Sequence, residues 1–333
     1  MLFEVSDLSV EYSSLGEISR AVNGVSLSVA SGEVVGIVGE SGSGKSTLAL
    51  ALLGLTRRNA RITAGSVRLE GTDLVGGGLS EKQLRQFRGR RIGLITQNAR
   101  SSLNPTIRIG KQIATVYATH TGAGRADARA AAIAALRLVG INDPERRFEA
   151  YPHELSGGMA QRAVIAMATV CRPDVVIADE ATSRLDVTIQ AQILDDLQRA
   201  VQEVGSSLVL ITQDLGVIAN YADRLYVMNA GEVIETAATS LLFQAPGHPA
   251  SVSLLESQLD LSDLQFRLRG LPVDGRELPE GCWLQTRCPF MDEGSGCRTV
   301  HPELSDVGGG QGDHQVRCHR ATVVIGRAAE LTR

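Results

Sequence analysis

The stretch from residue 34 to residue 50 constrains the fold more than any other part of this 333-residue chain. It begins with an apolar run, Val34 to Val38, which predicts a buried strand. The octapeptide Gly-Glu-Ser-Gly-Ser-Gly-Lys-Ser follows at residues 39–46, and Thr47 to Leu53 then predicts a helix. A strand, a glycine-rich loop and a helix in this order form the context in which G-x-x-x-x-G-K-[ST] acts as a phosphate-binding P-loop.

The residue types in this loop suit a nucleoside triphosphate. Glycines let backbone N–H groups converge on phosphate oxygens, and the start of the helix adds its positive dipole end. Lys45 is expected to reach the β- and γ-phosphates, and the Ser46 hydroxyl is expected to ligate Mg²⁺. A glycine-rich turn without function is disfavoured, because a strand and a helix flank the motif. The predicted phosphate-binding set is Gly39, Ser41, Gly42, Ser43, Gly44, Lys45, Ser46 and Thr47.

A second apolar strand, at 175–180, ends in the carboxylates Asp179 and Glu180. A wholly apolar strand suits a parallel sheet, and ligands bind at the carboxyl edge of such sheets. After a P-loop, a strand that ends in Asp is the expected Mg²⁺ partner, and Glu180 could orient or deprotonate a water molecule. For Asp179 taken alone, an ordinary polar strand end remains the alternative.

Three further sequence features are candidates for a binding site. Tyr12 ends a short β-segment, and its ring could stack on a base or simply lie at a sheet edge. Gln97 ends a predicted strand at 91–97. Ser156 precedes Gly157 and Gly158 at the predicted start of a helix, where it could cap the helix and create a second phosphate-binding surface.

The composition gives no indication of a membrane-spanning or a nucleic-acid-binding protein. No run of about eighteen apolar residues is present, and the first residues lack the pattern of a signal peptide, so we expect no membrane span. A net charge of −4 gives no indication of nucleic-acid binding. Residues 241–333 change to a Pro-, Gly- and Cys-rich composition, which predicts a separate appended unit after residue 240.

Four of the five cysteines lie in this tail, at Cys282, Cys288, Cys297 and Cys318. Their spacing lacks the C-x2-C pairs of a zinc ribbon, although Zn²⁺ remains an alternative. Four thiolates on irregular loops also suit a [4Fe–4S] cluster, and disulfides are disfavoured without an export signal. The remaining candidates are expected to be ordinary residues: Cys171 as a small buried side chain, and His301, His314 and His319 as surface residues rather than ligands.

The order of these motifs closely resembles that of the ATP-binding subunit of an ABC transporter, over residues 1 to about 240. The resemblance is carried by Tyr12, the P-loop at 39–46, Gln97, Leu155-Ser-Gly-Gly158, Asp179-Glu180, Ser183-Arg-Leu-Asp186 and the strand end at 213. A narrower resemblance to the oligopeptide/dipeptide (peptide/nickel) importer branch, Opp/Dpp type, is carried by the P-loop sequence, Ser101-Ser-Leu-Asn-Pro105, Leu185-Asp-Val-Thr-Ile-Gln190, Gly247-His-Pro249 and Cys282…Arg287-Cys-Pro289…Cys297…Cys318.

The resemblance implies an α/β fold with a RecA-like P-loop NTPase core, an antiparallel β subdomain and an α-helical signature subdomain at about 98–165. The core and subdomains would occupy residues 1–240, and the small cysteine-rich appendage, residues 241–333, would carry the four-cysteine cluster. The Arg287-Cys-Pro289 segment favours [4Fe–4S] over Zn²⁺. The loop after Gln97, near Ser101 to Pro105, would meet the membrane subunit.

The resemblance also implies a role for each matched residue. Tyr12 would stack on adenine, Ser46 and Asp179 would serve Mg²⁺, and Gln97 would act in catalysis by sensing both Mg²⁺ and the attacking water. Glu180 would be the general base. Ser156, Gly157 and Gly158 would contact the γ-phosphate of ATP bound to the opposite ATPase subunit, and Asp186 would lie in the loop that crosses the dimer interface.

One position departs from the family pattern. The family has a histidine where this chain has Gln213. Glutamine can donate a hydrogen bond to a γ-phosphate, but it cannot become cationic or relay a proton as imidazole does. We therefore predict a chain whose own site binds ATP but hydrolyses it poorly, while its signature turn completes the site of a different partner. The alternative is that glutamine substitutes adequately.

The predicted function is an ABC-type transport ATPase that powers peptide import at the cytoplasmic face of the inner membrane. Its expected partners are a second ATPase subunit in a heterodimer, two transmembrane permease subunits and an extracytoplasmic peptide-binding protein, with no nucleic acid. Specificity would lie in the permease and the binding protein. Two alternatives stay open: a soluble accessory ATPase of a carbon–phosphorus-lyase-like assembly, and a nucleotide or redox switch.

Overall fold

The structure is a computed structural model that describes residues 1–14, 16–182, 187–259, 268, 270, 273, 275–307 and 312–331. Its contacts divide the chain into two compact units. Unit 1 comprises Met1–Leu2, Val29–Val34 and Gly78–Ile211, and unit 2 comprises Phe3–Ser28, Val35–Gly77 and Thr212–Arg333. This division does not test the predicted boundary near residue 240, which stays a prediction. Within the described residues, no helix is long and apolar enough to cross a membrane.

Unit 1 contains three parallel strands, and two of them confirm the strands predicted at 91–97 and 175–180. β7 (Val175–Asp179) pairs with β6 (Ile92–Ile95) on one side and with β8 (Ser207–Thr212) on the other. The apolar residues of β7 and β8 are buried, as expected for strands covered on both faces. Gln97 follows β6, and Glu180 follows β7, so both lie beyond the carboxyl ends of neighbouring strands.

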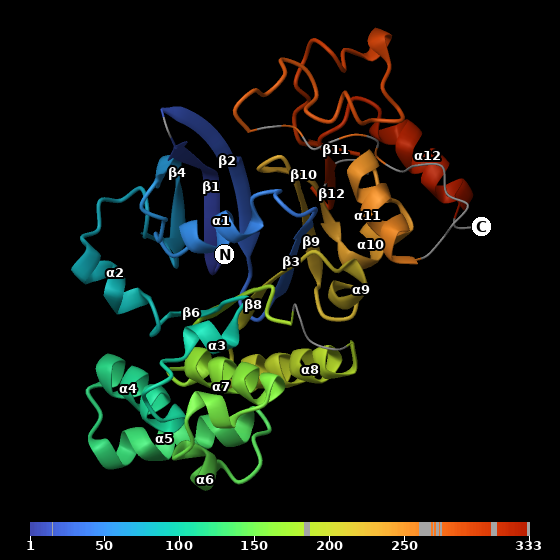
Figure 1. Cartoon of the computed structure of the whole chain (residues 1–333). Helices are drawn as coiled ribbons and strands as arrows, with labels where there is room; N and C mark the ends of the chain where they lie inside the picture. Colours follow the sequence, from blue (N-terminus) through green and yellow to red (C-terminus); the bar gives the residue numbers. More distant parts are fainter. Residues whose placement is uncertain are drawn as a thin grey trace. The chain divides into compact units, whose positions relative to one another are not determined.

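Helices make up most of the rest of unit 1 (Figure 1). Ala-rich α5 buries Ala128, Ala132, Ala135 and Leu136, which recur at helical spacing. Short α3 contains Ser101, and the Asn98 side chain caps it by accepting a hydrogen bond from the Ser101 backbone N–H. The elements are α2 (Glu81–Phe87), α3 (Ala99–Ser102), α4 (Ile109–Thr121), α5 (Arg125–Leu138), α6 (Pro144–Phe148), η1 (Pro152–Glu154), α7 (Gly157–Thr169) and α8 (Val187–Val204).

A four-stranded antiparallel sheet forms one part of unit 2, with the order β2-β1-β4-β5. Its strands are β1 (Phe3–Ser14), β2 (Glu17–Val29), β4 (Ala60–Leu69) and β5 (Thr72–Asp73). β1 contains an irregularity: its register with β4 shifts between Ser6 and Ser9, and Asp7 has a φ of 49°. This bulge interrupts the alternation of the sequence without ending the strand.

The other strands of unit 2 run in the order β11-β12-β10-β9-β3. β3 (Val34–Gly39) pairs in parallel with β9 (Arg224–Asn229), and β9 forms an antiparallel hairpin with β10 (Glu232–Ala238). α1 (Lys45–Ala51) follows β3 and begins two residues before the predicted Thr47. The other helices are α9 (Leu215–Ile218), α10 (Thr239–Gln244), α11 (Pro249–Leu259), η2 (Glu293–Ser295) and α12 (Ala321–Leu331).

The cysteine-rich tail contributes strands to this same sheet. β12 (His314–Val316) pairs antiparallel with β10, and β11 (Ser305–Asp306) pairs with β12. The expectation that His314 lies at the surface is wrong: it is buried, and its Nε2 lies 2.7 Å from Oε1 of the fully buried Glu235. Pairing with a carboxylate from a distant strand makes the burial of this polar ring tolerable.

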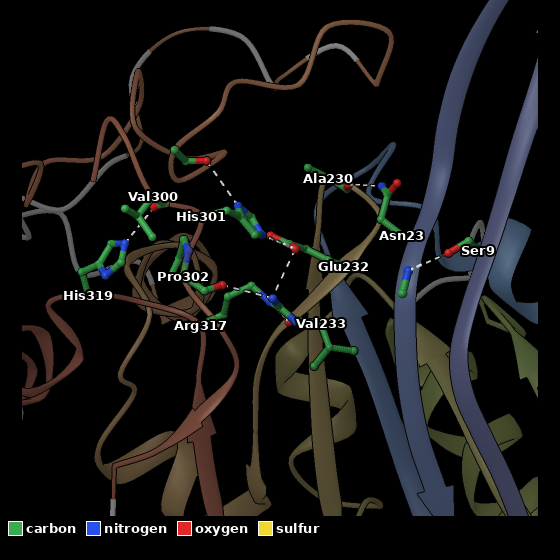
Figure 2. A network of polar contacts seen from close by, with 12 residues as sticks. Ser9, Asn23, Ala230, Glu232, Val233, Val300, His301, Pro302, Arg317 and His319 are labelled. Carbon is green, nitrogen blue, oxygen red and sulfur yellow. Dashed lines mark hydrogen bonds and ion pairs between the residues drawn. The ribbon is translucent and has the colours of Figure 1, made fainter. Parts of the chain in front are cut away.

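Figure 2 shows a second group of polar contacts between the tail and β10. Nε2 of His301 lies 2.9 Å from Oε2 of Glu232, and Nε of Arg317 donates to the carbonyl oxygen of Val233 at 3.0 Å. His301 is half-buried rather than at the surface, whereas His319 is exposed as expected. Burial lowers the pKa of His301, but the hydrogen bond and the charge of Glu232, together with the hydrogen bond to the Gly281 carbonyl oxygen, outweigh this effect, so the pKa of His301 is raised.

Two glycine-to-alanine variants in helices should shift stability in opposite directions. A Cβ at Gly110 in α4 would overlap the ring of buried Phe148 in α6, so Gly110→Ala should destabilise the protein by about 1–3 kcal/mol. A Cβ added at Gly326 in α12 would meet no heavy atom of the described residues within 4 Å, apart from the backbone of its own helix. Gly326→Ala should therefore stabilise the protein by about 0.5–1 kcal/mol through its higher helix propensity. Thermal unfolding of both variants checks these signs, and a Gly110→Ala protein as stable as the wild type would contradict the packing of α4 on α6.

Candidate functional site

The P-loop joins β3 to α1 within unit 2, and its conformation depends on glycine. Gly44 has a φ of 101°, and a Cβ there would overlap the carbonyl oxygen of Ala21. The backbone N–H of Gly231, at the turn between β9 and β10, donates to the Ser43 carbonyl oxygen at 3.0 Å. The loop is therefore held against two neighbouring segments, and only a residue without a side chain fits where it approaches them most closely.

Lys45 lies inside this loop rather than in solvent. Its side chain is 5% exposed, and its Nζ donates to the carbonyl oxygens of Gly39 at 2.7 Å and Glu40 at 2.9 Å. Nζ also lies 3.3 Å from Oγ of Ser43. A buried ammonium group needs such acceptors, and phosphate oxygens would serve it better because they are negatively charged. The loop thus presents a positive charge at the position that the motif assigns to the β- and γ-phosphates.

Tyr12 lies close to the helix that follows the P-loop. Its hydroxyl is 3.2 Å from Oγ1 of Thr47 in α1, although the two residues are 35 positions apart. The ring borders a pocket at the edge of the β1–β4 sheet. The pocket is lined by Glu11, Tyr12, Ser13, Ile18, Arg58, Asn59, Ala60 and Arg61. The structure therefore places an aromatic ring beside the P-loop helix; its stacking on a base stays a prediction.

The acidic residues of unit 1 lie at the end of β7. Asp179 is the last residue of the strand, and Glu180 has a left-handed φ of 47°. Its backbone N–H donates to the carbonyl oxygen of Ile211 in β8 at 2.8 Å, which holds this conformation. Nε2 of Gln97 donates to Oε2 of Glu180 at 2.5 Å. Two residues that the sequence nominated separately are thus brought together, in an arrangement that could position a water molecule.

The signature turn also belongs to unit 1, and its predicted cap is confirmed. Ser156 is the N-cap of α7, and its Oγ accepts a hydrogen bond from the Met159 backbone N–H. Gly157 and Gly158 open the helix, while Leu155 is buried and anchors the turn. An exposed serine beside free helical N–H groups is a surface that could bind an anion.

Two other residues were predicted to belong to the site, Gln213 and Asp186. Gln213 follows the last residue of β8, and its side chain is exposed. Residues Ser183 to Asp186, to which the interface loop was assigned, lie outside the described residues. The roles given to Gln213 and Asp186 therefore stay predictions.

The four tail cysteines line one small cavity together with His248, Leu284 and Phe290. Burial raises the pKa of Cys288 to about 11 and that of Cys318 to about 12, so neutral thiols are favoured unless a cation is present. The donor chemistry fits an iron–sulfur cluster or zinc. The metal site is nevertheless not confirmed: across the described residues, no three His, Cys, Asp or Glu side chains are arranged to hold a metal ion.

Cys171 does not belong to this group. It lies in unit 1, half-buried rather than fully buried, beside a pocket between α4, α5 and the end of α7. Burial raises the pKa of its thiol, which makes it less reactive than a free cysteine.

Comparison with known proteins agrees with this geometry. The sequence model of the ABC transporter family matches residues 22–183. The dipeptide transport ATP-binding protein DppD of Haemophilus influenzae is 43% identical over 321 residues, which span 96% of this chain and 95% of that protein. This chain belongs to the ABC transporter family of ATP-binding proteins.

Other relatives and solved structures extend the comparison. DppD of Escherichia coli is 43% identical and covers 96% of each chain. The oligopeptide transport ATP-binding protein OppD of Mycobacterium tuberculosis is 45% identical over 98% of this chain, which spans only 53% of that protein. The ATP-binding cassette MJ0796, solved as a dimer in a post-hydrolysis state with ADP and Pi, matches 71% of this chain with a TM-score of 0.63 and 27% identity. The predicted ABC ATPase fold is thereby confirmed.

Some contacts of the site could not be read from the sequence. The P-loop is held by Gly231, and the carboxylate of Glu40 is paired with Arg287 in the tail. Both partners are distant along the chain. The Arg287-Cys-Pro289 segment was noticed for its cysteine, and nothing in its sequence points to the P-loop.

Removing the buried ammonium group should abolish most nucleotide affinity. Lys45→Ala should weaken the binding of a fluorescent ATP analogue in the presence of Mg²⁺ by more than about tenfold, because the loop loses its charge-assisted donor. Lys82→Ala, which removes an exposed lysine from α2, is the matched control and should bind like the wild type. Equal affinity of the Lys45→Ala and wild-type proteins would contradict the assignment of the P-loop.

Proposed function

We propose that this chain is the ATP-hydrolysing subunit of an ABC importer that takes up peptides. The observation that carries the proposal is the similarity to DppD, a dipeptide transport protein by name, over nearly the whole of both chains. The P-loop with its buried Lys45 supports the binding of ATP. In a transport ATPase, the hydrolysis of that ATP would drive the movement of a substrate that the chain itself does not bind.

Each residue of the site then has a proposed part in the reaction. The P-loop amides and Lys45 hold the phosphates, while Ser46, Asp179 and Gln97 serve Mg²⁺. Glu180 acts as general base on the attacking water. The hydrogen bond from Gln97 to Glu180 supports this role, because it fixes a carboxylate oxygen beside the residue expected to sense the water.

We further propose that the chain works in a heterodimer with a second ATPase subunit. The signature turn, with Ser156 capping α7, would bind the γ-phosphate of ATP on the partner. Such a dimer closes only while the γ-phosphate bridges both subunits, so hydrolysis lets it open. Gln213 in place of a switch histidine would leave this chain's own site able to bind ATP and slow to hydrolyse it.

The proposed location is the cytoplasmic face of the cell membrane, on two permease subunits that receive peptide from an extracytoplasmic binding protein. The names of the DppD and OppD relatives support a transporter. A soluble accessory ATPase and a nucleotide or redox switch gain no support from these relatives. Purification from membranes together with a permease would separate the transporter from the soluble assembly.

The assembled transporter in lipid vesicles tests both function and asymmetry. The wild type should take up a labelled dipeptide when ATP is supplied, and Lys45→Ala should not. Gln213→His should raise the ATPase rate, whereas substituting the partner's catalytic glutamate by glutamine should remove nearly all of it. If the complex with the partner variant keeps its full ATPase rate, the asymmetry is refuted while the uptake result still stands.

We also propose that the four tail cysteines hold a [4Fe–4S] cluster, with Zn²⁺ as the alternative. Support comes from the convergence of all four thiols on one cavity and from the family resemblance of their spacing. Cys282, Cys288, Cys297 and Cys318 would bind the cluster as thiolates, and the bound cation would offset the burial that favours the neutral thiols.

Metal analysis after anaerobic purification tests the cluster. We expect about four iron atoms per chain with broad visible absorption, since that is the content of a [4Fe–4S] centre. Cys297→Ser should lose the iron, and Cys171→Ser, outside the tail, should retain it. Zinc-loaded protein without iron would refute the cluster in favour of the alternative.

A further inference from the structure

The tail reaches the P-loop through one ion pair. Nη1 of Arg287 lies 2.9 Å from Oε2 of Glu40, and Nη2 lies 3.2 Å from Oε1 of the same carboxylate. Glu40 is the second residue of the P-loop motif, and Arg287 directly precedes Cys288. The side chain of Glu40 is 28% exposed, and that of Arg287 is 8% exposed. This two-pronged contact is the geometry in which an arginine fixes a carboxylate most firmly.

Glu40 connects this ion pair to the phosphate-binding lysine. The backbone carbonyl oxygen of Glu40 accepts hydrogen bonds from Nζ of Lys45 at 2.9 Å and from the backbone N–H of Ser43 at 3.2 Å. The residue whose side chain is clamped by Arg287 therefore also carries a carbonyl that shapes the loop. If the carboxylate is released, Glu40 can rotate, and both loop contacts are free to change.

Arg287 is itself held in place by contacts within the tail. Its backbone N–H donates to the carbonyl oxygen of Leu284, whose side chain is 2% exposed. Cys282 is tied to Cys297 by a backbone hydrogen bond of 2.8 Å. The contacts of His301 and Arg317 with β10 fasten the same tail to the sheet (Figure 2). A guanidinium that is positioned in advance loses little entropy when it binds its carboxylate.

Within the part of the chain that the structure describes, the side-chain hydrogen bonds of Arg287 both go to Glu40. The buried Nε of Arg287 has no hydrogen-bond acceptor among the described residues. A mostly buried cation with one unsatisfied donor is costly, and the two hydrogen bonds to Glu40 offset that cost. Without Arg287, the carboxylate of Glu40 would have to find other partners at the entrance of the loop.

We propose that Arg287 is a positioning residue for the ATP site: through Glu40 it holds the P-loop in its phosphate-binding conformation. Nucleotide affinity then depends on the folded state of the cysteine-bearing segment. This inference rests on the proposed nucleotide role of residues 39–46. Because coupling between two sites is reciprocal, ATP bound to the P-loop also stabilises the segment around Arg287.

Binding of a fluorescent ATP analogue to the full chain, with Mg²⁺, tests the proposal. Arg287→Ala should weaken binding by about fivefold or more, the lower end of typical site-to-site coupling, and Arg287→Lys should restore part of it. Arg276→Ala is the matched control. It also breaks an ion pair between the tail and the rest of unit 2, from Arg276 Nη1 to Glu17 Oε2 at 2.6 Å, but Glu17 lies on β2 rather than in the P-loop. It should bind within about twofold of the wild type.

A double-mutant cycle separates positioning from general damage to the fold. Glu40→Gln should weaken binding about as much as Arg287→Ala, and the double variant should be no worse than either single variant. If Arg287→Ala does not fold, Arg287→Lys and Glu40→Gln complete the comparison. Hydrogen exchange provides a readout besides affinity: the ATP analogue should slow exchange in residues 282–297 of the wild type and leave exchange there unchanged in Glu40→Gln.

The outcomes distinguish this inference from the proposed function. Wild-type affinity in Arg287→Ala or Glu40→Gln, fully additive losses in the double variant, or an equal loss in Arg276→Ala would each overturn the role of Arg287. A wild-type chain that binds no ATP analogue would overturn the proposed nucleotide site instead.

Discussion

The burial of the Lys45 ammonium group is the interaction on which the site depends. A side chain that is 5% exposed and charged must be surrounded by acceptors, and the P-loop supplies them from its own carbonyl oxygens. The loop can wrap the lysine only because glycines permit its left-handed turns and its close approach to Ala21. Contacts from Gly231 and Arg287 then hold the wrapped loop from outside. The sequence motif, the backbone geometry and the tertiary contacts therefore all help to stabilise the buried charge of Lys45.

The sequence predicted the parts of the fold that local patterns decide. Apolar runs identified β3 and β7, and Ser156 identified the start of α7, because each signal acts within a few residues. The bulge at Asp7 and the buried His314 were missed. Both depend on a partner far away in the chain, β4 in one case and Glu235 in the other.

The candidate site shows the same difference between local features, which the sequence predicts, and contacts between distant residues, which it does not. Motifs nominated Lys45, Gln97 and Glu180, and the structure adds that Gln97 is hydrogen-bonded to Glu180. Spacing nominated four cysteines, and the structure brings them to one cavity without arranging a ligand set. The Glu40–Arg287 pair joins residues 247 positions apart, so no local pattern could have predicted it. Chemistry carried by residue types was accessible from sequence, whereas coupling between distant segments was not.

The pairing of β12 with β10 has a consequence for how the chain can be divided. β10 would otherwise be an edge strand, and its unpaired backbone groups would invite association with other chains. The tail closes that edge and at the same time covers the carboxylate of Glu235, which also accepts hydrogen bonds from the backbone of Gly247 and His248. A fragment that ends at residue 240 would expose the unpaired edge of β10 and the carboxylate of Glu235. The tail after residue 240 therefore contributes β11 and β12 to the sheet of the nucleotide-binding unit, and a shortened chain that keeps the edge of β10 covered would have to include these two strands.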